Sequence, residues 1–179
     1  MRKLQFCSGG LAIPGWESFD MDVDITKPLP FGDECASHIH CEHGLEHVTH
    51  QQAWTFLEEC HRVLMPWGRI RVAIPDIEKI SFGFVVNPSV AMKYQAVASP
   101  QLTRRGAIKA VVFNHGHKAA WTFELLSIFL TNTGFGSIQR WRPGESDRKE
   151  LRGIEVHWKT VGCEINDFET AVAEASREA

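Results

Sequence analysis

The sequence has no C-x-x-C pair, and its five cysteines are an odd number. That pattern does not suit a disulfide framework and favours reduced thiols. No apolar run approaches the roughly 18–20 residues that cross a bilayer. No block of Lys and Arg is present either, and the net charge is -3, so the footprint of a nucleic-acid-binding protein is missing. We therefore expect a cytoplasmic protein with neither a membrane nor a nucleic-acid partner.

What is present is typical of a globular chain. Its 179 residues are 44% hydrophobic and 23% charged, with no internal repeat. Domains usually contain about 100–150 residues, so one domain is the simplest organisation. We predict a single α/β domain over residues 1–165. The Ala- and Glu-rich stretch over residues 166–179 is predicted to be a C-terminal helix or a frayed tail.

Hydrophobic periodicity places the main elements. Strands are predicted over residues 3–7, 36–41, 69–74, 135–141 and 154–161, and helices over residues 50–64 and 119–132. Residues 77–113 are expected to contain helix and loop. Strands that alternate with helices predict a mostly parallel sheet with helices on its faces. Little chain separates the last two strands, so we expect them to form an antiparallel pair.

Four segments resemble one known family. They are LQFCSGG from Leu4, DITKPLPFGD from Asp24, FLEECHRVLMPWG followed by RIRVAIPD, and HKAAWTFELLSIFLTNTGF from His117. In this order they are similar to the class I S-adenosylmethionine-dependent methyltransferases, in particular to small type-11-like proteins. The third segment is the most specific of the four. The resemblance implies a Rossmann-like methyltransferase sheet, S-adenosylmethionine as the cofactor, and methyl transfer as the activity.

The resemblance also implies where the cofactor binds. A glycine turn lets a ligand lie against the backbone, an acidic residue after the second strand accepts from the ribose hydroxyls, and a later carboxylate accepts from the adenine amino group. The implied cofactor-binding residues are Cys7, Ser8, Gly9, Gly10, Asp20, Asp24, Ile25 and Glu42. The alternative is that the two glycines form only a turn and the aspartates a solvated loop.

The sequence departs from the family between its first strands. Only nine residues separate Gly10 from Asp20, and the gap from Asp20 to Asp24 is shorter still. A parallel crossover with its helix takes at least about 10–12 residues. We therefore predict a sheet that is truncated at its first two crossovers. The cofactor pocket would then be open, completed by a second subunit in a homo-oligomer, or lost.

The stretch CEHGLEHVTH contains His43, Glu46 and His47 in the spacing H-x-x-E-H. This is the pattern of an inverted zinc-peptidase motif, so a zinc-dependent hydrolase is one alternative function. Gly44 weakens the helix that such a motif needs. The methyltransferase resemblance accounts for the stretch better, as the loop after a strand and the start of a helix. A non-catalytic metal remains an alternative for the dense set of His38, His40, His43, His47 and His50. We interpret these histidines as partly buried polar residues and predict no metal ligands.

Methyl transfer to a hydroxyl is assisted by a general base within hydrogen-bond reach. The candidate catalytic residues are His43, His47 and His117, with His115 beside the last of them. The acceptor implied by the resemblance is a small molecule or a saccharide. A different class of function remains open: a catalytically degenerate methyltransferase fold that acts as a binding or scaffold protein.

Overall fold

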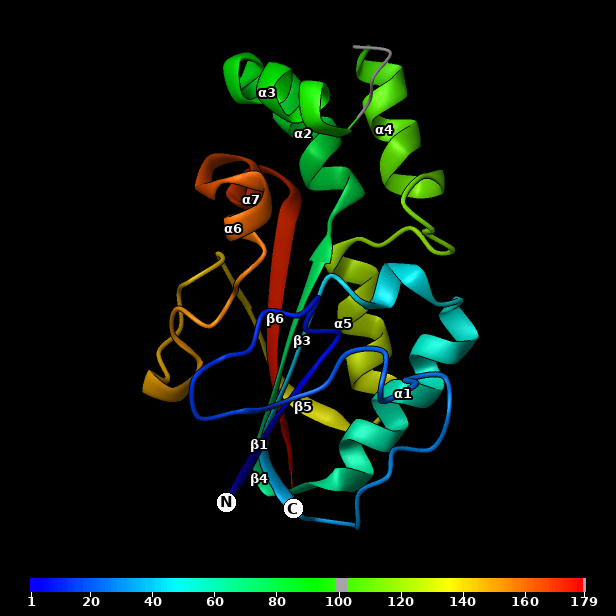
Figure 1. Cartoon of the computed structure of the whole chain (residues 1–179), viewed down its shortest axis with the longest axis vertical. Helices are drawn as coiled ribbons and strands as arrows, with labels where there is room; N and C mark the ends of the chain where they lie inside the picture. The colour runs from blue at the N-terminus through cyan, green and yellow to red at the C-terminus, as the bar shows by residue number, and fades with distance from the viewer. Residues whose placement is uncertain (99–102, 179) are drawn as a thin grey trace.

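The computed structural model describes residues 1–98 and 103–178, and its centre is a six-stranded sheet (Figure 1). The strands are β1 (Arg2–Phe6), β2 (Glu17–Ser18), β3 (Ala36–Glu42), β4 (Leu64–Pro75), β5 (Phe135–Trp141) and β6 (Thr170–Arg177). Their order across the sheet is β2-β1-β3-β4-β6-β5. The first four run parallel, and β6 is antiparallel to both of its neighbours. The predicted fold class, mostly parallel with an antiparallel C-terminal pair, is confirmed.

The helices fall into two groups (Figure 1). Those along one face of the sheet are α1 (His50–Val63) and α5 (Phe123–Asn132). Those beyond the carboxyl ends of the parallel strands, which we call the helical cap, are α2 (Ile77–Val86), α3 (Pro88–Ala98), α4 (Arg104–Phe113), α6 (Trp158–Val161) and α7 (Cys163–Glu169). The other helical segments of residues 1–98 and 103–178 are two 3-10 helices, η1 (Leu45–His47) and η2 (Lys149–Leu151). Among the described residues, none of the helices combines the length and the apolar character needed to cross a membrane.

Helix α1 shows how the sequence determines a local element. Thr49 accepts a hydrogen bond from the backbone N–H of Gln52, and the Gln52 side chain accepts from the Thr49 backbone, which forms a complete capping box. The apolar stripe of the helix, which includes Phe56 and Leu57, is fully buried against the sheet. The predicted start of this helix at residue 50 is confirmed.

Strand alternation gives the sheet two different faces. Leu4, Ile39 and Ile70 point to the helix-covered face and are fully buried in the main core. On the opposite face four polar side chains lie in register across neighbouring strands: Gln5, His40, Arg71 and Glu174. All four are buried, and we call them the polar row.

Side chains of the polar row form hydrogen bonds and ion pairs with the loops that cover this face of the sheet. No helix lies between β1 and β3, so the predicted truncation of the first two crossovers is confirmed. Gln5 Nε2 donates to the carbonyl of Leu11 at 2.9 Å, and Gln5 Oε1 accepts from the Ile13 N–H at 3.0 Å. Arg71 contacts the carboxylates of Glu155 and Glu174. These contacts satisfy polar groups that the loops would otherwise leave buried and unpaired.

Two predictions near the C-terminus were wrong. Residues 154–161, predicted to be a strand, instead consist of four residues without strand or helix, 154–157, followed by α6. The tail predicted to be a helix or a frayed end instead contains α7 and then β6, which lies between β4 and β5. β6 alternates Ala171, Ala173 and Ala175 under the helices with larger residues on the other face. Alanine favours helix in isolation, but pairing on both sides within the sheet overrides that preference.

The last long helix begins later than predicted. Residues 119 and 120 have no regular secondary structure, and Trp121 forms a parallel bridge with Asp76. Thr122 then caps α5 by accepting from the Leu125 N–H at 3.1 Å. Trp121 is fully buried in the core, which is why its position resembled the apolar face of a helix.

Candidate active site

A cavity of about 420 Å³ lies between the carboxyl ends of β1, β3 and β4 and the helical cap. Its floor is built from residues at and after the strand ends, including Cys7–Gly9, Glu42, His43, Glu46 and His47. Its roof comes from α3, α4 and α7 of the cap. Ligands of open α/β sheets bind at this edge, and the volume lies within the range of small-molecule sites.

The glycine loop after β1 turns sharply at the cavity. Cys7, Gly9 and Gly10 have φ angles of 55°, 55° and 77°, in the left-handed region that favours glycine. A Cβ atom added to Gly9 would meet no heavy atom within 4 Å. The backbone at Gly9 therefore borders open space, as a loop that accommodates a ligand requires.

Gly44 brings η1 against this glycine loop. A Cβ atom at Gly44 would lie 2.5 Å from Cys7 Sγ, which is far shorter than a normal contact. The absence of a side chain thus lets the loops after β1 and β3 pack together, and both of them line the cavity.

Replacing Gly44 with alanine should therefore push the two loops apart. We expect Gly44→Ala to lower the free energy of unfolding by about 1–3 kcal/mol, as overpacking usually does. Chemical denaturation measures the loss. Gly32→Ala is the matched control, because nothing lies within 4 Å of a Cβ atom at Gly32. Equal stability of the two variants would contradict this role for Gly44.

The predicted acidic residues differ in position. Asp20 follows β2, and its Oδ1 accepts from the Gly9 N–H at 3.3 Å, which places it beside the glycine loop. Asp24 lies outside the cavity lining, and its Oδ1 accepts from the N–H and the hydroxyl of Thr26 at 2.9 and 2.7 Å. Those bonds lower the pKa of Asp24. The Ile25 side chain is buried in the main core, so it does not face a ligand.

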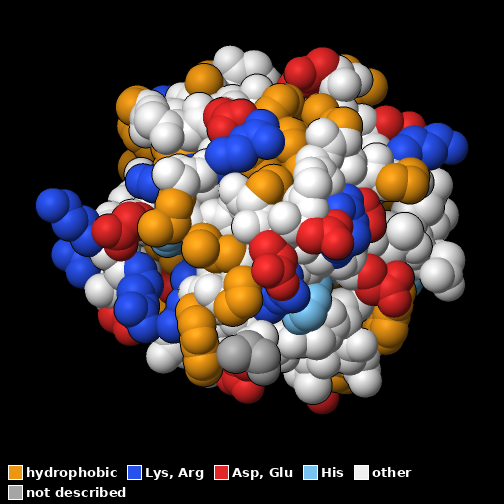
Figure 2. Space-filling view, turned by 90° about the horizontal axis from the view of Figure 1, so that it is seen from below, with side chains coloured by type: hydrophobic (Ala, Val, Ile, Leu, Met, Phe, Trp, Pro, Cys, Tyr) orange, Lys and Arg blue, Asp and Glu red, His pale blue; other side chains and the backbone are white. Residues whose placement is uncertain are grey.

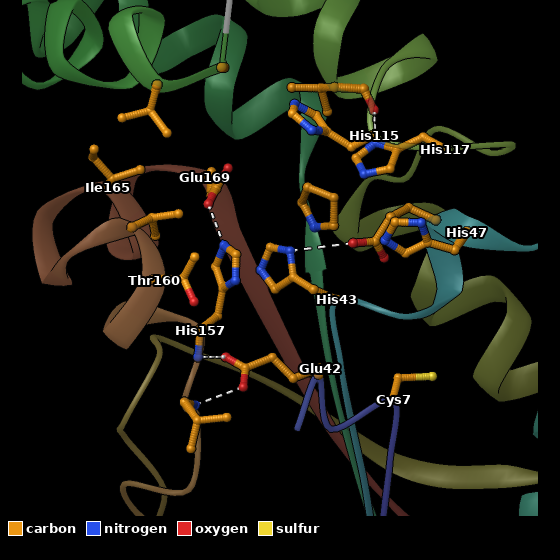
Figure 3. Close-up of a pocket in the computed structure, with 18 of the residues that line it drawn as sticks. Cys7, Glu42, His43, His47, His115, His117, His157, Thr160, Ile165 and Glu169 are labelled. Carbon is orange, nitrogen blue, oxygen red and sulfur yellow. Dashed lines mark hydrogen bonds and ion pairs between the residues drawn. The ribbon is translucent and has the colours of Figure 1, made fainter. Parts of the chain in front are cut away.

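Glu42 lines the cavity, but its carboxylate is held by the chain itself. Glu42 Oε2 accepts from the Val156 N–H at 2.7 Å, and Oε1 accepts from the His157 N–H at 3.1 Å. A buried carboxylate with two backbone donors is well satisfied. Glu42 therefore fixes the loop before α6 and brings His157 to the cavity (Figure 3).

Two histidine–glutamate pairs lie face to face there (Figure 3). His43 Nδ1 lies 3.3 Å from Glu46 Oε1, and His157 Nε2 lies 3.0 Å from Glu169 Oε1. The His43 and His157 rings stack with centroids 3.9 Å apart. Burial alone would lower the pKa of His43, but the Glu46 carboxylate outweighs it and raises that pKa. Burial would likewise raise the pKa of Glu46, but the contact with His43 lowers it.

A second group of histidines approaches from the opposite wall. The rings of His47 and His117 meet edge to face with centroids 4.9 Å apart, and His115 and His117 are 5.9 Å apart. His117 Nδ1 lies 2.5 Å from the Val111 carbonyl oxygen. Because a carbonyl only accepts, Nδ1 carries the hydrogen and Nε2 is the basic nitrogen when the ring is neutral. The pKa of His47 is lowered, because the effect of burial is larger than the opposing effect of the neighbouring Glu46 carboxylate.

The residues of the H-x-x-E-H pattern do not converge as ligands on one point. His43 groups with His157 and Glu169, whereas Glu46 and His47 group with His117. Leu45–His47 is one turn of 3-10 helix, not the α-helix that would place two histidines on one metal. The geometry thus gives no support to the zinc-peptidase interpretation of this motif.

The structure brings most predicted site residues together and adds others. The predicted residues that line the cavity are Cys7, Ser8, Gly9, Glu42, His43, His47 and His117. Gly10, Asp20, Asp24 and Ile25 are not among the lining residues. The sequence did not reveal Glu169 or His157 as site residues. His157 lay inside the strand predicted over residues 154–161. A histidine at the end of an apolar run, followed twelve positions later by a glutamate, carries no motif that could have revealed this pair.

Comparison with known proteins agrees with this geometry. A family model described as "Methyltransferase domain" matches residues 15–72. The chain superposes on a SAM-dependent methyltransferase from Thermotoga maritima, a possible histamine N-methyltransferase, with a TM-score of 0.57 and 13% identity, over 99% of this chain and 82% of the other. For a SAM-dependent methyltransferase from Archaeoglobus fulgidus the TM-score is 0.53 and the identity 14%, over 98% and 86%.

A phosphoethanolamine N-methyltransferase from Haemonchus contortus, solved with phosphomonomethylethanolamine and S-adenosylhomocysteine, gives a TM-score of 0.56 at 11% identity, over 100% of this chain and 50% of the other. No curated protein matches the sequence. Identities this low show a shared fold and leave the substrate open. The matched segment and the sheet together show that the chain has the fold of the S-adenosylmethionine-dependent methyltransferases, in a reduced form.

Proposed function

We propose that the chain binds S-adenosylmethionine and transfers its methyl group to a small-molecule or saccharide acceptor. The observation that supports this proposal is the continuity of the site. One cavity is lined both by the glycine loop, with Cys7–Gly9, and by the histidines of the η1 and α4–α5 segments. Donor and acceptor bound there would meet at the carboxyl edge of the sheet.

The residues on the donor side fit the cofactor. Gly9 offers backbone with open space beside it, and Asp20 presents a carboxylate next to that backbone. A carboxylate accepts from the two ribose hydroxyls, and the glycine loop leaves room for the amino-acid end. When bound, the cofactor supplies an electrophilic methyl carbon. The chain's own contribution is to orient the acceptor and to accept its proton.

His117 is the best-placed base for a hydroxyl or amine acceptor. Its Nδ1–H is held by the Val111 carbonyl, so its Nε2 lone pair is available to take a proton. His47 packs against its edge, and the lowered pKa of His47 keeps that neighbour uncharged near neutral pH. An uncharged neighbour does not oppose proton uptake by His117.

The roof of the cavity indicates the character of the acceptor. The cap contributes mainly apolar side chains, among them Tyr94, Val97, Val111 and Ile165, above the polar histidines of the floor. We propose an acceptor with a nucleophilic oxygen or nitrogen at one end and an apolar surface at the other. A saccharide that presents its apolar ring face to the cap would meet this description.

A second candidate is a methyltransferase fold that has kept its sheet and lost transfer. The observation that favours it is the missing helix between β1 and β3, because such a helix would help to close a pocket around adenosine. The two candidates differ in cofactor affinity, because a scaffold protein has no need to bind S-adenosylhomocysteine.

Asp20 tests the donor side. We expect Asp20→Ala to weaken binding of S-adenosylhomocysteine by about 10- to 100-fold, because charged hydrogen bonds to the ribose are lost. Competition against a fluorescent cofactor analogue measures the change. Asp147→Ala, in an exposed part of the loop before η2, is the matched control and should bind as the unmodified chain does. An Asp20 variant with unchanged affinity would show that the ribose is held elsewhere.

A further inference from the structure

Three ligand-type side chains converge on one point of the cavity. Nitrogen atoms of His43 and His157 and an oxygen of Glu169 all lie within 4.8 Å of one another. They come from three separate segments: the loop after β3, the loop before α6, and the end of α7. Figure 3 shows the two rings side by side with the Glu169 carboxylate above them.

A second observation concerns the buried carboxylate behind His43. Glu46 is 1% exposed, and neither of its oxygens has a hydrogen-bond partner among the described residues. Its Oε1 faces His43 Nδ1 at 3.3 Å, an ion-pair distance without hydrogen-bond alignment. Burying a carboxylate without hydrogen bonds is costly, so its position needs an explanation.

Metal coordination supplies that explanation. A histidine that ligates a metal through one nitrogen almost always turns its other N–H toward a carboxylate or carbonyl, which orients the ring. His43 has this arrangement, with Nδ1 toward Glu46 and Nε2 on the side of Thr170, at 2.9 Å from Thr170 Oγ1. Nε2 is therefore the nitrogen left for a metal, and an ion there would replace the contact with Thr170.

We propose that His43, His157 and Glu169 form a binding site for a divalent transition metal, with Glu46 as the carboxylate that orients His43. Two imidazoles and one carboxylate are a ligand set that zinc and other first-row divalent ions accept, whereas calcium and magnesium prefer oxygen alone. Three protein ligands leave at least one coordination position free. That position faces the cavity, where, if the proposed function holds, an oxygen of the acceptor would bind.

The second cluster, Glu46, His47 and His117, is a weaker candidate for the ion. His47 is exposed and His117 is half-buried, and the Nδ1 of His117 is already held by a carbonyl. The first cluster has the more buried ligands and the orienting carboxylate. The two clusters share no ligand, so substitution can tell them apart.

The test is calorimetric titration of the chelator-treated chain with Zn²⁺, without cofactor or acceptor. We expect one ion per chain with micromolar or tighter affinity. Glu169→Gln and His157→Ala should each weaken binding more than about 100-fold, because loss of an orienting carboxylate alone costs 10- to 100-fold. Glu46→Gln should fall in that smaller range. His38→Ala, on β3 outside the cavity, is the matched control and should bind zinc as the unmodified chain does.

Three outcomes would overturn the proposed metal site. Absence of a stoichiometric zinc site in the folded chain would remove it, and so would an unchanged affinity in Glu169→Gln, a variant that keeps the size of the side chain. Loss of binding in His117→Ala but not in His157→Ala would place the ion in the other cluster. Circular dichroism of each variant confirms that it is folded. Because the readout is metal binding, a negative result here leaves the methyl-transfer proposal to its own test.

Discussion

Replacing Arg71 with methionine should lower the free energy of unfolding by about 3–5 kcal/mol, which is the usual cost of removing one partner from a buried ion pair. Arg71 is fully buried in the polar row, between the carboxylates of Glu155 and Glu174. Its Nη1 also donates to the Glu145 carbonyl at 2.9 Å. Without the guanidinium, two carboxylates remain in the interior without a counter-charge. Urea denaturation at neutral pH measures the loss.

The pH dependence of that loss has a definite sign. In the intact chain, burial would raise the pKa of Glu155, but contact with Arg71 lowers it below the ordinary value of 4.5. The stability from this pair is therefore fully present above 4.5 and is lost as pH falls through the lowered pKa. In Arg71→Met the pKa-lowering contact with Arg71 is gone, and burial is opposed only by His40 and the Gly144 N–H, so Glu155 protonates more readily in the folded state. The difference between the two proteins should shrink as pH falls.

Two control variants test the cause of the loss. Arg142→Met removes an exposed arginine that pairs with Asp167, and exposed pairs contribute little, so its stability should stay near that of the intact chain. Adding Glu155→Gln and Glu174→Gln to Arg71→Met removes the unpaired charges and should restore a large part of the loss. A triple variant as unstable as Arg71→Met would contradict the charge explanation and indicate lost packing instead.

The second large effect is expected at His117. If Nε2 of His117 accepts the proton of the acceptor, His117→Ala should lower kcat by about 10²–10⁴-fold, the usual contribution of a general base. Affinity for S-adenosylhomocysteine should change little, because His117 lies away from Cys7 and the glycine loop (Figure 3). Methyl transfer from labelled cofactor to the acceptor, once identified, measures kcat, and calorimetry measures affinity.

His61→Ala is the matched control for this experiment. His61 lies on α1 against Phe135, outside the cavity lining, so its loss should leave turnover near that of the intact chain. If His117→Ala loses cofactor affinity and turnover to the same extent, the base assignment is wrong and the residue supports the fold of the loop. Rescue of turnover by added imidazole would favour the assignment.

The described surface opposite the helical cap has no single dominant charge that would indicate a binding partner (Figure 2). Figure 2 shows the side of the molecule opposite the helical cap, where charged side chains of both signs are interspersed with small apolar groups. Such a mixed surface does not point to a partner of one charge. The predicted homo-oligomer therefore stays a prediction, and size-exclusion chromatography with light scattering would test it.

Local patterns predicted the first half of the chain well. Alternation in β3 and β4, the capping box at Thr49 and the short gaps around Asp20 each depend on neighbouring residues. The missing crossover helices could be predicted because a helix needs a minimum length of chain. Ten residues between β1 and β2 fold as a loop held by Gln5, as that length allows.

The C-terminal part was predicted less well because its structure depends on distant contacts. Residues 170–177 are rich in alanine and glutamate, which locally favour a helix, but they form a strand paired on both sides. Glu174 is buried because it meets Arg71 across the sheet, a contact between residues more than 100 positions apart. Glu169 immediately precedes β6, and the backbone of His157 is held by Glu42 of β3. The His157–Glu169 pair therefore also depends on how the strands assemble, which local patterns do not reveal.

In the candidate site, too, residues in short motifs could be predicted, whereas contacts between distant residues could not. The glycine loop and the histidines after β3 could be identified from short motifs. The hydrogen bonds from the backbone N–H groups of Val156 and His157 to the Glu42 carboxylate could not be predicted from the sequence, because these partners are distant in the chain. The same bonds carry His157 to His43, and so the metal proposal depends on the structure rather than on the H-x-x-E-H pattern.

The central claim is that this reduced sheet still binds the methyl-donor cofactor, and the most direct test is calorimetric titration of the purified chain with S-adenosylhomocysteine. We predict saturable binding of one molecule per chain with a dissociation constant in the micromolar range. A folded sample that gives no heat at several temperatures, and no shift in thermal unfolding, would contradict the claim. The fold would then be best explained as a scaffold that has lost the transferase reaction.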